Sequence, residues 1–97
     1  MSSQAASGSA EATGFQGQIP SVEPLLIEVI STLALAAHAY LADNDGREPD
    51  PASAELAIDV ASRAFERVKQ RLRTEERLAI AQMLTETRLV FVKKRGA

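Results

Sequence analysis

The chain has no cysteine, no tryptophan and a single histidine among its 97 residues. Without cysteine it cannot form a disulfide framework, a thiolate metal site or a cysteine nucleophile. One histidine supplies too few nitrogen ligands for an ordinary zinc site. Aromatic residues make up only 4% of the sequence, so no platform for stacking nucleic-acid bases is evident. We therefore expect no cofactor and no metal ion.

The length and overall composition are those of one small globular domain. Hydrophobic residues make up 45% and charged residues 25% of the chain, close to the averages for globular proteins. A chain of 97 residues has room for one hydrophobic core. Residues 1–17 lack the basic start and the apolar run of a secretory signal, so we expect a cytoplasmic protein.

The sequence divides into residues 1–20, predicted to be a disordered tail, and residues 21–97, predicted to be a single helical domain. The tail is rich in serine, alanine, glycine and glutamine, and Phe15 is the only large apolar residue between Ser2 and Gln18. Such a segment buries too little surface to offset the entropy lost on ordering. A docking peptide around Phe15 is the alternative interpretation.

The first predicted helix contains a long apolar run, Leu25 to Ala42, after a suitable N-cap at Ser21. The run is close to the minimum length for crossing a bilayer, so a membrane span is one interpretation. At 100° per residue, however, the polar side chains fall in one sector of the helix: Glu28, Ser31, Thr32 and His38. A charged residue inside a membrane is costly, and no basic cluster flanks the run. The pattern favours a core helix over a membrane span.

Two further helices follow an acidic loop that contains Gly46, Pro49 and Pro51. We expect the second helix to begin at Asp50 or Ser53 and to end near Leu72, and the third to run from Thr74 to about Val92. The break between these two helices is very short, which favours an antiparallel hairpin. The predicted fold class is all-α, with a helical hairpin plus one apolar helix.

The apolar faces of these helices exceed what one small protomer can bury. The second helix carries one stripe: Ala57, Ala61, Ala64, Phe65, Val68 and Leu72. The third helix is apolar on two sides, with Ile80, Leu84 and Phe91 on one and Leu78, Leu89 and Val92 on another. Because exposed apolar patches usually mark association, we predict a homodimer or higher oligomer. The interface is expected on the first helix, at Leu26, Val29, Ile30, Leu33, Ala37 and Tyr40.

Charge is divided unevenly along the chain. Residues 1–59 contain nine acidic residues and one basic residue, whereas residues 60–97 contain ten basic residues and four acidic ones. A basic strip on the second helix consists of Arg63, Arg67 and Arg71, spaced four residues apart. One interpretation of this strip is a surface that binds the phosphate groups of nucleic acid or of an anionic membrane. The other interpretation is a charged face that is simply solvated. With a pI of about 5.4 and no recognition motif, nucleic acid is the less favoured partner.

One charged residue of the third helix, Arg88, lies close to an apolar stripe. Arginine in such a place normally requires an acidic partner. Asp59 is one candidate, and Glu76 or an acid of another protomer are the alternatives. We expect a structural ion pair, Asp59 with Arg88, which fixes the register of the helices. An anion-binding site at Arg88 is the less favoured interpretation.

The candidate residues for catalysis or metal binding do not have the spacing that known sites of these kinds require. In the acidic loop, aligning Gly46 with the glycine of an EF-hand puts Leu41 and Ala52 at two essential ligand positions. His38 has no nucleophile and no orienting acid in its vicinity, so we expect a partly buried structural role. Neither a phosphate-binding glycine loop nor a catalytic triad can be assembled. We do not expect an enzyme.

Several segments between Ile30 and Val92 together resemble one family. They are Leu35 to Ala42, Glu48 to Pro51, Leu56 to Asp59, Leu72 with Glu75 and Glu76, and Thr87 to Val92. This pattern is similar to the small bacterial family catalogued as domain of unknown function eighteen-forty-four, and it covers about two thirds of the chain. Residues Arg67 to Arg71 depart from that family's Lys-Thr and Gly-Asn, and His38 replaces its glutamine. The resemblance implies an all-helical bacterial protein, importance of Asp59 and Arg88 for the fold, and no established activity.

These observations predict an assembly or adaptor module without enzymatic activity that binds further copies of itself and other proteins. The first alternative is an accessory subunit of a membrane complex or an anionic surface, attached through the first helix or the basic C-terminus. The second alternative is a weak, non-specific nucleic-acid binder.

Overall fold

A computed structural model of the chain describes residues 19–43 and 46–96. Within these ranges it has three α-helices, α2 (Val22–Leu41), α3 (Pro51–Val68) and α4 (Thr74–Gly96), and a single-turn 3-10 helix, η1 (Lys69–Arg71). The predicted all-α, three-helix fold class is confirmed. Of the predicted disordered tail, residues 1–18 lie outside the described residues. Ile19 and Pro20 precede α2 without regular secondary structure.

The helices begin at the capping residues that the sequence provides. Ser21 is the N-cap of α2. At the start of α3, the Asp50 carboxylate accepts hydrogen bonds from the Ser53 backbone N–H (3.1 Å) and hydroxyl (2.7 Å). Pro51 occupies the first turn, where a missing N–H costs nothing. Asp50 is therefore the N-cap of α3, and Ser53 is its partner rather than an alternative cap.

The connection between α3 and α4 is longer than expected. We predicted that the second helix ends near Leu72, but α3 ends at Val68 and η1 follows. The Arg77 guanidinium donates to the carbonyl oxygens of Lys69 (3.2 Å) and Leu72 (3.3 Å). The Lys69 carbonyl also accepts a hydrogen bond from the Leu72 N–H (3.2 Å), so backbone and side-chain donors together close the turn.

The third helix begins at Thr74, as predicted, and continues to Gly96, beyond the expected end near Val92. At its start, the Glu76 carboxylate accepts hydrogen bonds from the Arg73 backbone N–H (3.0 Å) and guanidinium (3.1 Å). Acidic residues in the first turn and basic residues in the last turn complement the helix dipole. The sequence near Val92, although rich in strand formers, is therefore helical.

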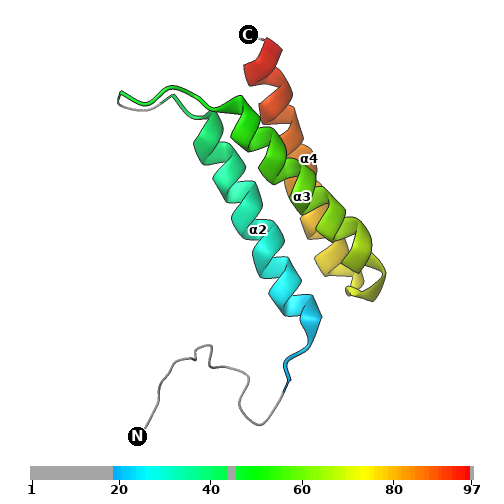
Figure 1. Ribbon diagram of the computed structural model, residues 1–97. Coiled ribbons are helices and arrows are strands. Elements are labelled where there is room, and N and C mark those ends of the chain that lie inside the picture. Colours follow the sequence, from blue (N-terminus) through cyan, green and yellow to red (C-terminus); the bar gives the residue numbers. More distant parts are fainter. Residues whose placement is uncertain (1–18, 44–45, 97) are drawn as a thin grey trace, which may run out of the picture.

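The three helices run alternately in opposite directions, and α4 packs against both α2 and α3 (Figure 1). Their buried side chains form two clusters. One lies toward the α3–α4 turn and contains Ile30, Ala61, Phe65, Val68, Leu72, Ile80 and Leu84. The other lies toward the α2–α3 loop and contains Ala37, Leu41, Ala54, Ala57 and Ile58. The apolar stripe predicted on the second helix thus forms one wall of the core, with Ala64 half-buried beside it.

The polar side chain of Thr87 is buried where α4 meets α2. Its hydroxyl donates to the carbonyl oxygen of Met83 (2.9 Å) and lies 3.2 Å from Nε2 of His38 on α2. Because a hydroxyl has one hydrogen, the His38 Nε2–H must be the donor in the second contact. His38 therefore links the two helices by a hydrogen bond, but the residue is exposed rather than partly buried as we predicted.

Candidate functional site

An exposed, mainly apolar area lies on α2 and α3, on the side away from α4. We call it the α2–α3 surface, and it consists of Val29, Leu33, Ala36, Tyr40, Leu56 and Val60. A shallow groove of about 320 Å³ runs between the two helices at its centre. Val29, Tyr40, Leu56 and Val60 are 41%, 36%, 65% and 44% exposed. The three helices of one chain therefore do not cover these large apolar side chains, which remain exposed to water.

The predicted interface on the first helix overlaps this surface only in part. Ile30 and Ala37 are completely buried among the helices of the same chain, so placing them in an interface between chains was wrong. Leu26 and Leu33 are half-buried against the core. Of the six residues, Val29 and Tyr40 are exposed.

The reason for this error lies in the breadth of the apolar sector of α2. A helix that is apolar over most of its circumference does not reveal which edge its own neighbours cover. Ile30 and Ala37 face α3 and α4, and the next edge around the helix carries Val29, Ala36 and Tyr40. The sequence prediction also missed Leu56 and Val60, although their four-residue spacing on α3 indicates a common face.

A second exposed apolar row runs along α4. Leu78, Leu89 and Val92 are 64%, 56% and 62% exposed, and we call these three residues the α4 row. The opposite side of the helix is buried, with Ile80 and Leu84 in the core and Phe91 packed partly against it. The predicted division of this helix into two apolar sides is confirmed, and only one of them is covered within the chain.

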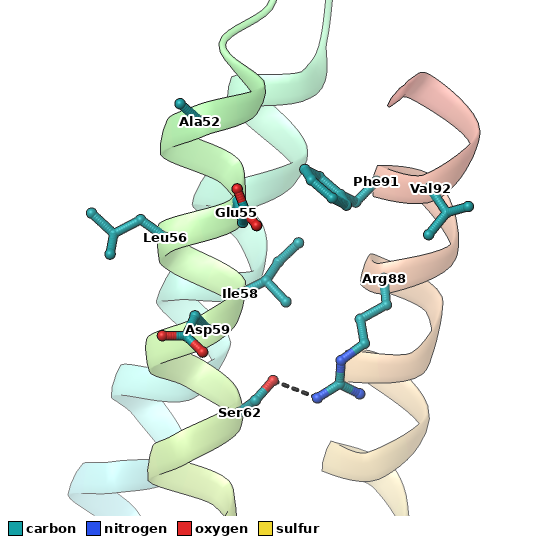
Figure 2. A pocket seen from close by; sticks show the side chains of 9 residues that line it. All are labelled: Ala52, Glu55, Leu56, Ile58, Asp59, Ser62, Arg88, Phe91 and Val92. Carbon is teal, nitrogen blue, oxygen red and sulfur yellow. Dashed lines mark hydrogen bonds between the residues drawn. The ribbon is translucent and has the colours of Figure 1, made fainter. Parts of the chain in front are cut away.

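Between α3 and α4 the structure has an open groove of about 590 Å³ (Figure 2). Ile58 points from α3 toward α4, and Phe91 points from α4 toward α3, so the two side chains form its apolar part. The other lining residues are Ala52, Glu55, Leu56, Asp59, Ser62, Arg88 and Val92. The polar and charged groups of this set are the Glu55 and Asp59 carboxylates, the Ser62 hydroxyl and the Arg88 guanidinium.

Asp59 and Arg88 both line this groove, but they bind other partners. The Arg88 guanidinium donates to the Ser62 hydroxyl across the groove (Figure 2). The Asp59 carboxylate instead pairs with Arg63, one turn further along α3, at 3.0 Å. The predicted Asp59–Arg88 ion pair is therefore replaced by two other contacts. The physical reason is that a four-residue spacing on one helix gives Asp59 a partner with no long-range requirement.

The basic strip is largely offset by acids of the same chain. Besides the pair between Arg63 and Asp59, the Arg71 guanidinium lies 2.7 Å from the Glu23 carboxylate at the start of α2. Arg67 lies between them on the exposed side of α3. Two of the three charges of the strip are thus paired within the chain, which reduces the field that a phosphate group would meet.

Two carboxyl groups have altered acidity, and both belong to helix caps. Hydrogen bonds from the hydroxyl and backbone N–H of Ser53 hold the pKa of Asp50 below its ordinary value. Hydrogen bonds from the Arg73 guanidinium and backbone N–H likewise lower the pKa of Glu76. Asp50 is exposed and Glu76 is half-buried, and both serve to start a helix. Their acidity is thus a consequence of capping and gives no indication of catalysis.

The described residues contain no group of three histidine, aspartate or glutamate side chains placed to hold a metal ion. Among the same residues, one helix, α2, is long and apolar enough to cross a membrane, with a mean hydropathy of 1.6. Only 22% of that apolar segment is buried in the protein. Length and composition of one helix are weak evidence for a membrane span, since the core helix of a small bundle meets the same criteria.

Comparison with known proteins adds no relative: no family model matches the chain, and neither a curated protein nor a solved structure is significantly similar to it. The resemblance to domain of unknown function eighteen-forty-four stays a prediction. The candidate functional features are therefore the α2–α3 surface, the α4 row and the groove between α3 and α4.

Proposed function

We propose that the chain is a non-enzymatic assembly module whose α2–α3 surface binds a second copy of itself. The observation that carries this proposal is the exposure of Val29, Leu56 and Val60 beside a groove on two packed helices. Burying such an area removes apolar surface from water, at about 25 cal/mol for each Å². When two identical surfaces pair about a two-fold axis, one contact buries the apolar surface of both copies. Two-fold dimers are the commonest assemblies.

The α2–α3 surface is suited to a protein partner because it is rigid. Its residues project from two helices that share a core, with Leu33 packed against both buried clusters. Little ordering entropy is then lost on binding. The groove between α3 and α4, which shares Leu56 with the α2–α3 surface, is where we propose that other proteins bind, as the adaptor role of the module.

A lipid bilayer is the second candidate to cover α2, favoured by the mean hydropathy of this helix. The same helix, however, contributes Ile30, Ala34 and Leu41 to the core. If α2 moved into a membrane, it would leave Phe65 and Leu84 without their cover. Every core side chain that packs against α2 would lose its apolar contacts in this way, and each loss destabilises the fold. We therefore favour protein over lipid as the partner that covers α2.

The test is the mass of the assembly in solution, measured by sedimentation equilibrium without detergent at about 10–50 μM, the range of a moderate dissociation constant. We expect the wild-type chain to exceed the mass of one copy. Val29→Asp and Leu56→Asp place a charge in the surface and should each weaken association at least about tenfold. Leu35→Asp is the matched control, because Leu35 is 71% exposed on the opposite edge of α2.

Three results would overturn the proposal. The first is a wild-type chain that stays a single copy throughout the concentration range. The second is an equal loss of association in Leu35→Asp, which would show that any charge on α2 disrupts the assembly. The third is sedimentation of the wild-type chain with membranes and its solubility only in detergent. Circular dichroism of each variant verifies that the helices are retained.

A further inference from the structure

The exposed side of α4 follows the three- and four-residue spacing of a coiled-coil seam. Its members, all exposed, are Glu75, Leu78, Gln82, Thr85, Leu89 and Val92. Alternating steps of three and four residues keep side chains on one line along a helix, facing a second helix. The α4 row therefore forms the apolar part of a longer seam, with polar residues at its centre and an acidic residue at its beginning.

The seam is flanked by opposite charges at its two ends. Glu75 lies in the first turn of α4, and Lys93 lies in the last turn on the same side of the helix. Two parallel copies would place Glu75 beside Glu75 and Lys93 beside Lys93. Two antiparallel copies place Glu75 of each chain beside Lys93 of the other, in two symmetric pairs. Charge complementarity therefore selects the antiparallel arrangement.

One antiparallel register also matches the four central side chains of the seam, and in it Glu75 lies at the level of Val92 of the other copy. When Leu78 of one copy faces Leu89 of the other, Gln82 faces Thr85 in the central layers. Both apolar layers are then leucine against leucine, and both central layers join an amide to a hydroxyl that can accept its hydrogen bond. Glu75 and Lys93 lie within one residue of the same level, about 1.5 Å along the axis.

From this complementarity we propose that the exposed seam of α4 binds the same seam of a second copy, antiparallel, with Leu78 opposite Leu89. The contact is distinct from the α2–α3 surface, which lies on the side of the molecule away from α4. Either contact can therefore fail without the other. Two different two-fold contacts on one chain join more than two copies, in a closed tetramer or an open filament.

Cysteine cross-linking tests this register without background, because the natural chain has no cysteine. The double variant Leu78→Cys, Leu89→Cys should form an intermolecular disulfide on mild oxidation, seen as a dimer on a non-reducing gel. The two positions cannot cross-link within one helix, since eleven residues separate their Cα atoms by about 16 Å. Each single variant, Leu78→Cys or Leu89→Cys, is the matched control and should stay largely monomeric on the gel.

The same double variant in the Leu56→Asp background separates this inference from the proposed function. Cross-linking that persists there shows that the α4 contact forms independently of the α2–α3 surface. Cross-linking of Leu78→Cys alone, as efficient as that of the double variant, would overturn the inference in favour of parallel or random contacts. Failure of the double variant to cross-link in either background would also overturn it.

A charge exchange, made in the Leu78→Cys, Leu89→Cys background, provides a second test that replaces no further apolar residue of the seam. Glu75→Lys and Lys93→Glu each place like charges together in the antiparallel contact, and each should reduce cross-linking several-fold. The double exchange Glu75→Lys, Lys93→Glu restores opposite charges and should restore cross-linking. No recovery in the double exchange would contradict the antiparallel arrangement, because a contact without these pairs gains nothing from the exchange.

Discussion

The two longest helices, α2 and α4, each have one buried edge and one exposed apolar edge, but the exposed edges differ in chemistry. The exposed edge of α2 continues onto α3 through Leu56 and Val60, and this surface is mainly apolar, with Glu28, Thr32 and Ser53 lining the same grooves. The exposed edge of α4 is a single row, interrupted by Gln82 and Thr85 and flanked by Glu75 and Lys93. A broad apolar surface provides affinity with little orientation, whereas polar and charged positions specify orientation at the cost of affinity.

This difference assigns separate roles to the two edges. We expect the α2–α3 surface to supply most of the association energy and the α4 seam to select the register of a weaker contact. Both edges depend on the same buried core, since the rows project from helices that Ile30, Leu84 and Phe65 hold together. Disrupting the core therefore disrupts both edges, and substitutions on the surface separate them.

The largest expected effect comes from the buried side of α4. Leu84 is 1% exposed, and truncating it in Leu84→Ala leaves a cavity that should cost about 3 kcal/mol of unfolding free energy. Leu89→Ala, on the exposed side of the same helix, is the matched control and should change stability by less than about 0.5 kcal/mol. Urea denaturation followed by circular dichroism measures both. Equal losses in the two variants would contradict the division of α4 into a buried and an exposed side.

The buried hydroxyl of Thr87 should have the next largest effect. Thr87→Val keeps the shape of the side chain but removes the acceptor for His38 Nε2–H, and should cost about 1 kcal/mol. Thr85→Val is the matched control, because Thr85 is exposed in the seam. That control should leave the stability of one chain nearly unchanged while it weakens the preference for the antiparallel register. Thermal unfolding and the cross-linking assay record the two effects separately.

Salt should separate the two edges without any substitution. Raising the salt concentration from about 0.05 M to 0.5 M shortens the screening length to a few Å, so exposed ion pairs weaken. Cross-linking between Leu78→Cys and Leu89→Cys should then slow, because the Glu75–Lys93 pairs are exposed. Association through the α2–α3 surface should persist, since apolar burial is not screened. Equal sensitivity of both contacts to salt would remove the distinction between the two edges.

Acid should produce the smallest of these effects, through the helix caps. Folding lowers the pKa values of Asp50 and Glu76, so the folded chain binds their protons less readily than the unfolded chain does. Their stabilisation is therefore complete above the pKa values of the unfolded chain and is lost as the pH falls through those of the folded chain. Asp50→Asn keeps a good N-cap but cannot titrate. Its melting temperature should fall less steeply in acid than that of the wild-type chain.

The helices could be predicted from the sequence because their signals are local. Asp50 and Thr74 mark helix starts by side-chain chemistry that acts within one turn, and the structure places helix starts there. The two apolar sides of the third helix, one with Leu84 and one with Leu89, follow from its period in the same way, although the period did not say which side is buried. The predicted end of α3 was less accurate, because the turn that follows this helix depends on hydrogen bonds from Arg77 of the next helix.

The contacts between helices could not be predicted with the same success, because they depend on which edge each neighbour covers. Ile30 and Val29 are adjacent apolar residues, yet Ile30 is buried in the chain and Val29 is exposed. For Asp59, the sequence did contain a usable signal: Arg63 lies four residues away and competes with any distant partner. A partner on the same helix should therefore be considered before one on another helix.

Sedimentation equilibrium of the wild-type chain, in buffer without detergent, tests the central claim most directly. If further copies cover the apolar edges of α2, α3 and α4, the measured mass at about 10–50 μM should be at least twice that of one chain. It should also fall toward the mass of one chain on dilution. A constant mass of 10.4 kDa across this range would contradict the account, because both exposed edges would then remain in water.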